Sequence, residues 1–185
     1  TLSETLIDVN RLSTTIKNIL DLAWLGAENA NLEEHHFDLS ATLSELKDLG
    51  MKLAVHKHIT INGRIEPRVS VLVMEDKINR AILNAIDNAI KYTPNDKTIT
   101  ISLKKNKGRA IVEVQDTGIG ISEKDQAHIF ERFYRGSKSA KTVGSGLGLA
   151  IAQGIIKAHG GDISISSIHG KGTTVLISLP LAEAT

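Results

Sequence analysis

Apolar residues in the first 27 positions follow a heptad rhythm. They recur at spacings that alternate between four and three residues, at Leu2, Leu6, Val9, Ile16, Leu20 and Ala23. The rhythm is broken only where Ser13 takes a seam position beside Leu12, and no proline interrupts the segment. This pattern predicts one long helix from Leu2 to about Ala27. Because its apolar stripe is narrow, the helix needs a partner helix; packing on its own domain is the alternative.

Beyond a hinge expected at Asn29–Asn31, the pattern changes to a mixture of helices and strands. The predicted helices run from Ser40, as the N-cap, to His56, from Asp76 to Lys91, near Glu123–Ile129, and from Leu147 to Ala158. The predicted strands are Ile59–Ile61, Val69–Val73, Thr98–Leu103, Ala110–Val114, Asp162–Ser167 and Thr173–Leu179. Turn residues at 105–108 make the third and fourth strands a hairpin, and the last two strands form a closing hairpin.

The bulk composition narrows the class of protein. A length of 185 residues suffices for one well-packed domain, with or without a short appendage. The formal net charge of +1 creates no field that would favour nucleic acid. The absence of cysteine excludes disulfides and thiolate metal sites, and no apolar run reaches the ~18 residues that span a bilayer. We therefore expect a soluble chain that neither binds nucleic acid nor spans a membrane.

The first cluster of candidate chemistry lies on the predicted helix before Pro94. Asn84, Asn88 and Lys91 are spaced i, i+4 and i+7, so they share one helix face, and Tyr92 follows them. Two amides and an ammonium group on one face can hold phosphate oxygens and a hydrated cation. Mg²⁺ needs few protein ligands when phosphates supply the rest. The alternative is that the asparagines are merely exposed polar positions.

The second cluster, Asp116-Thr117-Gly118-Ile119-Gly120, follows a predicted strand. A carboxylate at a strand end can accept a hydrogen bond from an exocyclic amine, and the glycines let the backbone approach a flat ring and adopt positive φ. Asp and Gly are also common in ordinary strand-to-helix turns. By itself this cluster is a weak signal.

The third cluster, Gly144-Ser145-Gly146-Leu147-Gly148-Leu149, has the glycine spacing of a dinucleotide fingerprint. A Rossmann fold requires a strand immediately before the glycines. The preceding segment, Ser137 to Val143, is polar and carries lysines, so we reject that interpretation. What remains is a mobile loop that leads into a helix N-terminus, where free N–H groups and the helix dipole attract phosphate.

With the segment Ile129-Phe130-Glu131-Arg132-Phe133-Tyr134-Arg135, these clusters resemble the catalytic domain of bacterial sensor histidine kinases. The family's N box, first glycine box, F box and second glycine box occur in the family's order, over about Phe37 to Leu181. The resemblance implies an α/β (α+β) two-layer sandwich, with helices on one face of a mixed, mostly antiparallel sheet and an N-terminal coiled-coil-like helix. It divides the chain into residues 1–30, the C-terminal part of a dimerisation and phosphotransfer helix, and residues 31–185, an ATP-binding catalytic domain.

The resemblance also implies roles for single residues. Asn88 would ligate Mg²⁺, and Asn84 would act in catalysis through phosphate or metal-bound water. Arg135 would neutralise γ-phosphate charge during transfer, and Asp116 would bind the adenine amino group. The remaining ATP contacts would come from Lys91, Tyr92, Gly118, Gly120, Gly144, Gly146, Leu147 and Gly148, with the second set of glycines in a lid. Phe130 and Phe133 would be packing anchors for that lid.

No histidine of this chain lies in the family's His-acidic-x-x-Pro setting, so the acceptor histidine is expected upstream of Thr1. Adjacent His35-His36 lack a third metal ligand of convincing spacing. The resemblance implies a cytoplasmic domain of a homodimeric integral membrane kinase. Its cofactors would be ATP and Mg²⁺, and its partners its own phosphotransfer domain and a response regulator.

Two alternatives remain open within this fold. ATPases of the same fold resemble one another in having a glutamate, four residues before the metal-binding asparagine, that activates water. Here that position is Asn84, and an amide cannot accept a proton at neutral pH. This difference favours phosphoryl transfer over hydrolysis. The other alternative, a degenerate nucleotide-binding module, is separated from a kinase by an ATP titration.

Overall fold

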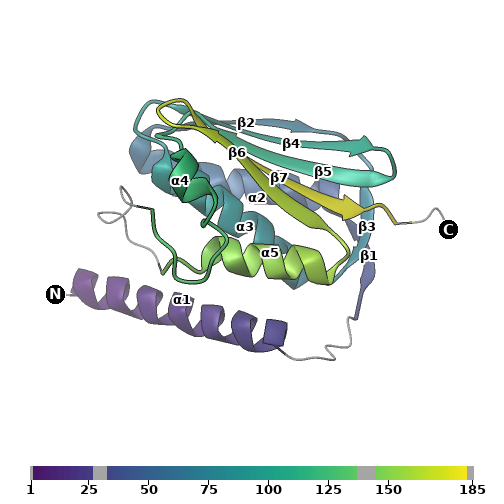
Figure 1. Cartoon of the computed structure of the whole chain (residues 1–185), viewed down its shortest axis with the longest axis horizontal. Helices are drawn as coiled ribbons and strands as arrows, with labels where there is room; N and C mark the ends of the chain where they lie inside the picture. Colours follow the sequence, from purple (N-terminus) through teal and green to yellow (C-terminus); the bar gives the residue numbers. More distant parts are fainter. Residues whose placement is uncertain (1, 27–32, 137–144, 183–185) are drawn as a thin grey trace.

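The computed structural model describes residues 2–26, 33–136 and 145–182, and the expected hinge at Asn29–Asn31 lies outside them. Figure 1 shows one sheet with helices α2 (Leu39–Ala54), α3 (Glu75–Tyr92) and α5 (Gly148–Ala158) on one of its faces. Helix α1 (Leu2–Gly26) runs beneath them and contacts α5. Among the described residues, no helix has both the length and the apolar character needed to cross a bilayer.

The main sheet has five strands in the order β2-β4-β5-β7-β6. The strands are β2 (Thr60–Ile65), β4 (Thr98–Asn106), β5 (Arg109–Asp116), β7 (Gly172–Pro180) and β6 (Asp162–Ile168). Strands β2 and β4 pair in parallel, and the other neighbours pair antiparallel. A separate antiparallel pair joins β1 (His35–Asp38) to β3 (Ser70–Val73). The predicted fold class, a two-layer sandwich on a mixed and mostly antiparallel sheet, is confirmed.

The core lies between the sheet and the three covering helices. Strand β4 alternates, with Ile99, Ile101 and Leu103 buried, as expected for a sheet with one covered face. Helix α3 buries Ile78 and Ile82, four residues apart on one face. Because the chain is poor in aromatic residues, these branched aliphatic side chains fill the space between the layers.

Two predicted boundaries were wrong. Ser40 is not the N-cap of α2: the Asp38 carboxylate accepts from the N–H groups of Ser40 and Ala41, while the Ser40 hydroxyl donates to the Glu66 carbonyl. The helix predicted near Glu123–Ile129 is only the short α4 (Glu123–Gln126). The hairpin turn is confirmed, with Lys107 and Gly108 both at positive φ, as a type I′ turn requires.

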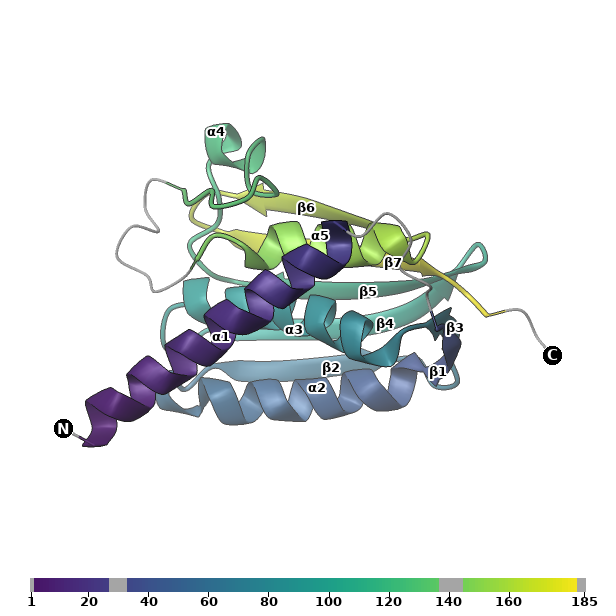
Figure 2. The same cartoon turned by 90° about the horizontal axis from the view of Figure 1, so that it is seen from below.

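Helix α1 presents two different faces. The predicted seam is exposed where its side chains are described, with Val9 and Ile16 each 56% accessible and Leu20 62%. The opposite face carries buried Asn18 and Asp21 and packs on the domain, as Figure 2 shows, where α1 crosses α5 and α3 diagonally. The single predicted helix is confirmed, and the helix packs on its own domain while the described side chains of its heptad seam stay uncovered.

This packing is specific. The Asp21 carboxylate pairs with Lys77 Nζ and with Arg80 Nε, each at 3.1 Å, and Arg80 also donates to Asn18 Oδ1 at 2.6 Å. The Lys77 ammonium lies 4.9 Å from the centroid of the Trp24 ring, close enough for a cation–π contact. Helix α1 is therefore joined to α3 by a partly buried polar network.

Candidate nucleotide-binding site

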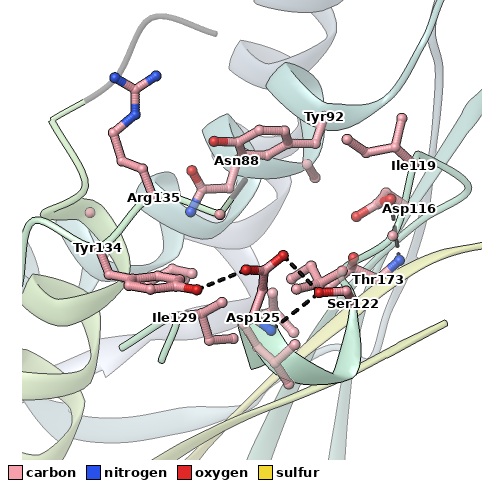
Figure 3. Close-up of a pocket in the computed structure, with 18 of the residues that line it drawn as sticks. Asn88, Tyr92, Asp116, Ile119, Ser122, Asp125, Ile129, Tyr134, Arg135 and Thr173 are labelled. Atoms are coloured by element: carbon pink, nitrogen blue, oxygen red, sulfur yellow. Dashed lines mark hydrogen bonds between the residues drawn. The ribbon is translucent and has the colours of Figure 1, made fainter. Parts of the chain in front are cut away.

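One cavity gathers residues from all the motifs identified in the sequence. Helix α3 contributes Asn88 and Tyr92, which lie four residues apart on one face. Asp116 closes strand β5, Arg135 follows α4, and Gly146 precedes α5. In Figure 3, Arg135 and Asp116 lie at opposite ends of the group, and Asn88 and Tyr92 lie across from Asp125 and Ser122. Gly120 and Gly148 also line the cavity.

The Asp116 carboxylate is buried at one end, with 7% of the residue exposed. Its Oδ1 accepts from the N–H of Gly118 at 2.8 Å and from the N–H of Thr173 at 3.3 Å. Burial raises the pKa of Asp116 above its ordinary value, and the two backbone hydrogen bonds offset part of that rise. Both bonds end on Oδ1, so Oδ2, which accepts no hydrogen bond from the described residues, can accept a donor from a ligand.

The glycines around Asp116 are required by close backbone contacts. A Cβ on Gly118 would lie 2.4 Å from the Tyr92 carbonyl oxygen, and one on Gly120 would lie 2.1 Å from the Ile168 carbonyl oxygen. Gly120 also has a φ of +64°. The N–H of Ile119 donates to the Tyr92 carbonyl, so this loop is tied to the end of α3. Gly118 therefore shapes the cavity through its backbone and is not one of the residues that line it.

The second glycine box meets the N box at the start of α5. Asn84 Nδ2 donates to the Gly148 carbonyl at 3.0 Å. Gly146 has a φ of +71°, and a Cβ there would lie 2.7 Å from backbone atoms of Phe133 and Tyr134. Gly144 and the rest of the predicted lid, residues 137–143, lie outside the described residues.

Three other predicted ligands are not among the residues that line the cavity: Asn84, Lys91 and Leu147. The Lys91 ammonium pairs with the Asp87 carboxylate one turn earlier on α3. Leu147 is 5% exposed and belongs to the hydrophobic core. Their assignment as nucleotide contacts stays a prediction.

The two F-box phenylalanines behave differently. Phe130 is partly buried and packs against the hydrophobic core, as predicted for an anchor. Phe133 is 69% exposed and has a φ of +65°, so the prediction that it is a packing anchor was wrong. Its N–H donates to the Gly146 carbonyl at 3.0 Å, so its backbone, and not its ring, joins the F box to the second glycine box.

Sequence reasoning missed a polar group at the floor of the cavity. The Asp125 carboxylate accepts from the Tyr134 hydroxyl through Oδ1 and from the Ser122 hydroxyl through Oδ2, both at 2.7 Å. The hydrogen bond to Asp125, followed by burial, raises the pKa of Tyr134. The spacing Ser122-x-x-Asp125 is that of a capping box, a signal that would have identified the pair.

Lys57 supports α3 from outside the cavity and was also missed. Its ammonium group donates to the carbonyls of Ile90, Lys91 and Thr93, at 2.8, 3.0 and 2.9 Å. These carbonyls lie at the C-terminal end of α3, where a helix has unpaired acceptors and a partial negative charge. Lys57 thereby fixes the turn that carries Tyr92.

Comparison with known proteins identifies the family. Residues 74–183 match the family model described as histidine kinase-, DNA gyrase B-, and HSP90-like ATPase. Sensor histidine kinase RppB of Synechocystis sp. is 39% identical over 92% of this chain and 38% of its own length. Sensor histidine kinase WalK of Bacillus subtilis is 33% identical over 95% of this chain and 30% of its own length. The chain thus spans less than half the length of these curated relatives.

Solved structures of sensor kinases are also similar to this chain. Full-length ShkA in complex with AMPPNP has a TM-score of 0.83 and 28% identity, over 95% of this chain and 37% of that one. The mycobacterial sensor histidine kinase MprB has a TM-score of 0.71 and 27% identity, over 80% of this chain and 97% of that one. The chain therefore belongs to the histidine kinase-, DNA gyrase B- and HSP90-like ATPase family, and its cavity lies in an ATP-binding domain of the sensor histidine kinase type.

Proposed function

We propose that this chain binds Mg-ATP and transfers the γ-phosphoryl group to a histidine on the phosphotransfer domain of its parent sensor kinase. The observation that carries the proposal is the convergence of Asp116, Asn88 and Arg135 on one cavity. The buried carboxylate at one end offers an acceptor for the adenine amino group. The guanidinium at the other end offers charge to the γ-phosphate.

The described residues fit a magnesium ion that arrives with the nucleotide. No group of three or more His, Cys, Asp or Glu side chains in the described ranges is arranged to hold a metal without it. Asn88 lines the cavity and supplies one amide oxygen, which suits an ion whose other ligands are phosphates and water. Asn88 would hold the ion, which would supply neutralisation of the phosphate charge, and Asn84 and Lys91 would contact the phosphates from beside the cavity.

The carboxylates of the cavity argue for transfer over hydrolysis. Of the described residues that line it, only Asp116 and Asp125 carry a carboxylate. Asp116 stands at the end of the cavity away from Arg135, and both oxygens of Asp125 already accept hydroxyl donors. Asn84, at the position of the ATPase base, donates to a backbone carbonyl and cannot accept a proton. Neither carboxylate of the cavity, nor Asn84, is therefore placed to activate water.

The parent protein is proposed to be a homodimeric membrane-bound kinase, with this chain in the cytoplasm and a response regulator as a further partner. The exposed seam of α1 supports the dimer, because three or more apolar side chains at heptad spacing need a partner helix. We assign residues 1–30 to the dimerisation and phosphotransfer domain and residues 31–185 to the ATP-binding domain.

A transfer assay tests the proposal. The chain, radiolabelled ATP and Mg²⁺ are mixed with and without the separately purified phosphotransfer domain of the parent. Acid-labile, base-stable label should appear on that domain and not on this chain, and the R135A variant should slow transfer more than it weakens ATP binding. Rapid phosphate release without an acceptor would favour an ATPase, and the absence of ATP binding would favour a degenerate module.

A further inference from the structure

A carboxylate on the floor of a cavity for a polyanion requires an explanation. Asp125 is half-buried, lines the cavity, and would repel the phosphates of a bound nucleotide. The proposed reaction gives it no chemical role. Its two oxygens are instead used within the protein, one by the Tyr134 hydroxyl and one by the Ser122 hydroxyl, as the dashed lines in Figure 3 show.

The bond from Tyr134 to Asp125 holds the chain on one side of Arg135. The Tyr134 hydroxyl reaches Asp125 from the residue just before the arginine. On the other side, Gly136 lies against the same carboxyl group, since a Cβ there would be 3.3 Å from both Cγ and Oδ2 of Asp125. Asp125 therefore contacts both chain neighbours of Arg135.

The second glycine box restrains the same segment from another direction. The N–H of Phe133 donates to the Gly146 carbonyl at 3.0 Å, and the backbone of Gly146 packs against Tyr134. The exposed Arg135 follows a segment that is held through Phe133, whose φ of +65° is a strained conformation for a bulky residue, and through the hydrogen bond from Tyr134 to Asp125.

We propose that Asp125 is a positioning residue for Arg135, acting through the Tyr134 hydroxyl to hold the guanidinium where it meets the γ-phosphate. The inference rests on the proposed function, because it needs a nucleotide whose terminal phosphate contacts Arg135. Asp125 acts through its acceptor oxygen, and its negative charge, which repels the phosphates, is not needed for this role. Asparagine keeps an acceptor for Tyr134 and its amide can donate to the Ser122 hydroxyl, whereas alanine removes both contacts.

Mg-ADP and Mg-AMPPNP differ by the terminal phosphate, so comparing them isolates the contact between Arg135 and that phosphate. Calorimetric titration of this chain gives Kd for each, and the ratio of the two values reports what the terminal phosphate adds. The variants are Y134F, D125A, D125N, R135A and the double variant Y134F/R135A. The matched control is E131Q, because Glu131 pairs with His128 on the same segment and does not line the cavity.

Y134F and D125A should each lower the preference for AMPPNP over ADP by about tenfold, or 1.4 kcal/mol, towards the value of R135A. The double variant should lose no more than R135A alone, because a displaced arginine and an absent one are equivalent. D125N and E131Q should keep the wild-type ratio. Y134F removes one hydroxyl, so it remains informative if D125A does not fold.

Three results would overturn the inference. Additive losses in the double variant would mean that Tyr134 and Arg135 act independently. Equal weakening of ADP and AMPPNP in Y134F would mean that Tyr134 shapes the cavity as a whole. D125N behaving like D125A would mean that charge, and not the acceptor, is what matters. A fourth result concerns the proposed function itself. If R135A kept the wild-type ratio, Arg135 would not contact the terminal phosphate, and the proposed role of Arg135 would be wrong. The first three results leave that role intact and contradict only the role of Asp125.

Discussion

Replacing Asp116 by asparagine changes one atom of the cavity and exposes the proposed base contact to a direct test. In the wild type, Oδ1 accepts from the N–H groups of Gly118 and Thr173. Oδ2 then remains for the adenine amino group. Asparagine has one acceptor oxygen and one donor nitrogen in place of two acceptors.

Either orientation of the new side chain is unfavourable for the nucleotide. If its oxygen stays on the two backbone N–H groups, its amide nitrogen faces the adenine amino group and two donors oppose each other. If the amide is flipped, the backbone donors lose their acceptor. Loss of a hydrogen bond to a charged acceptor costs about 1.5–3 kcal/mol, and an unpaired buried donor about 1–3 kcal/mol. We expect a total of about 3–4 kcal/mol, which is a 10²- to 10³-fold rise in Kd for Mg-ATP.

The stability of the nucleotide-free protein should move in the opposite direction. Burial raises the pKa of Asp116, so the folded carboxyl group binds a proton more tightly than the unfolded one. Its contribution to stability is therefore most favourable at low pH and is lost as pH rises from the unfolded pKa of 3.8 through the raised folded value. Asparagine carries no charge, so D116N should be at least as stable as wild type at neutral pH.

Isothermal calorimetry measures Kd for Mg-ATP, and scanning calorimetry measures Tm with and without nucleotide. D116N should keep its Tm without ligand and lose the increase that Mg-ATP produces. The control is E113Q, which makes the same chemical change on the same strand but outside the cavity. An affinity of D116N within about threefold of wild type, roughly 0.7 kcal/mol, would refute the assignment of Asp116.

The remaining predictions concern contacts that lie outside the cavity. Lys57→Met keeps the aliphatic stem but leaves three carbonyls at the end of α3 without their shared donor. The free energy of unfolding in urea should fall by about 2–3 kcal/mol, and an unchanged midpoint would contradict this. Asp21→Asn leaves two cations of α3 without their counter-ion, so the packing of α1 on α3 should weaken by about 3 kcal/mol and α1 should detach. Trp24, the single tryptophan, should then show a red shift in its fluorescence, and an unshifted spectrum would contradict the prediction. Thr93 is fully buried, and its hydroxyl has no hydrogen-bond partner among the described residues; Thr93→Val should therefore stabilise the fold by about 1 kcal/mol in the same urea experiment, and a destabilised variant would show that the hydroxyl is satisfied.

Local pattern alone determined much of this protein. The α3 helix follows from apolar residues at helical spacing and ends at Thr93-Pro94, and the β4–β5 hairpin follows from alternation and from a turn that tolerates positive φ. Each of these signals lies within the segment whose structure it predicts. The order of the four motifs could also be recognised in the sequence alone, and it predicted the correct fold and family.

Contacts between distant segments were decided only by the tertiary structure. Ser40 and Asp38 are both good helix caps, and the choice between them depends on the Ser40 hydroxyl, which donates to Glu66, 26 residues away. The roles of Lys57 and Asp125 likewise depend on which carbonyls and hydroxyls reach their side chains. No local periodicity encodes those distances.

Helix α1 shows most clearly which features the sequence pattern determines and which depend on tertiary packing. Its heptad pattern identified the helix and the seam that needs a partner, because spacing along a helix determines which side chains share a face. The pattern carried no sign that the other face would hold Asp21 against Lys77 and Arg80, since a polar residue on a helix has the same spacing whether it faces water or a buried ion pair. Which of the two it meets depends on where α3 lies, and only the packed structure determines that.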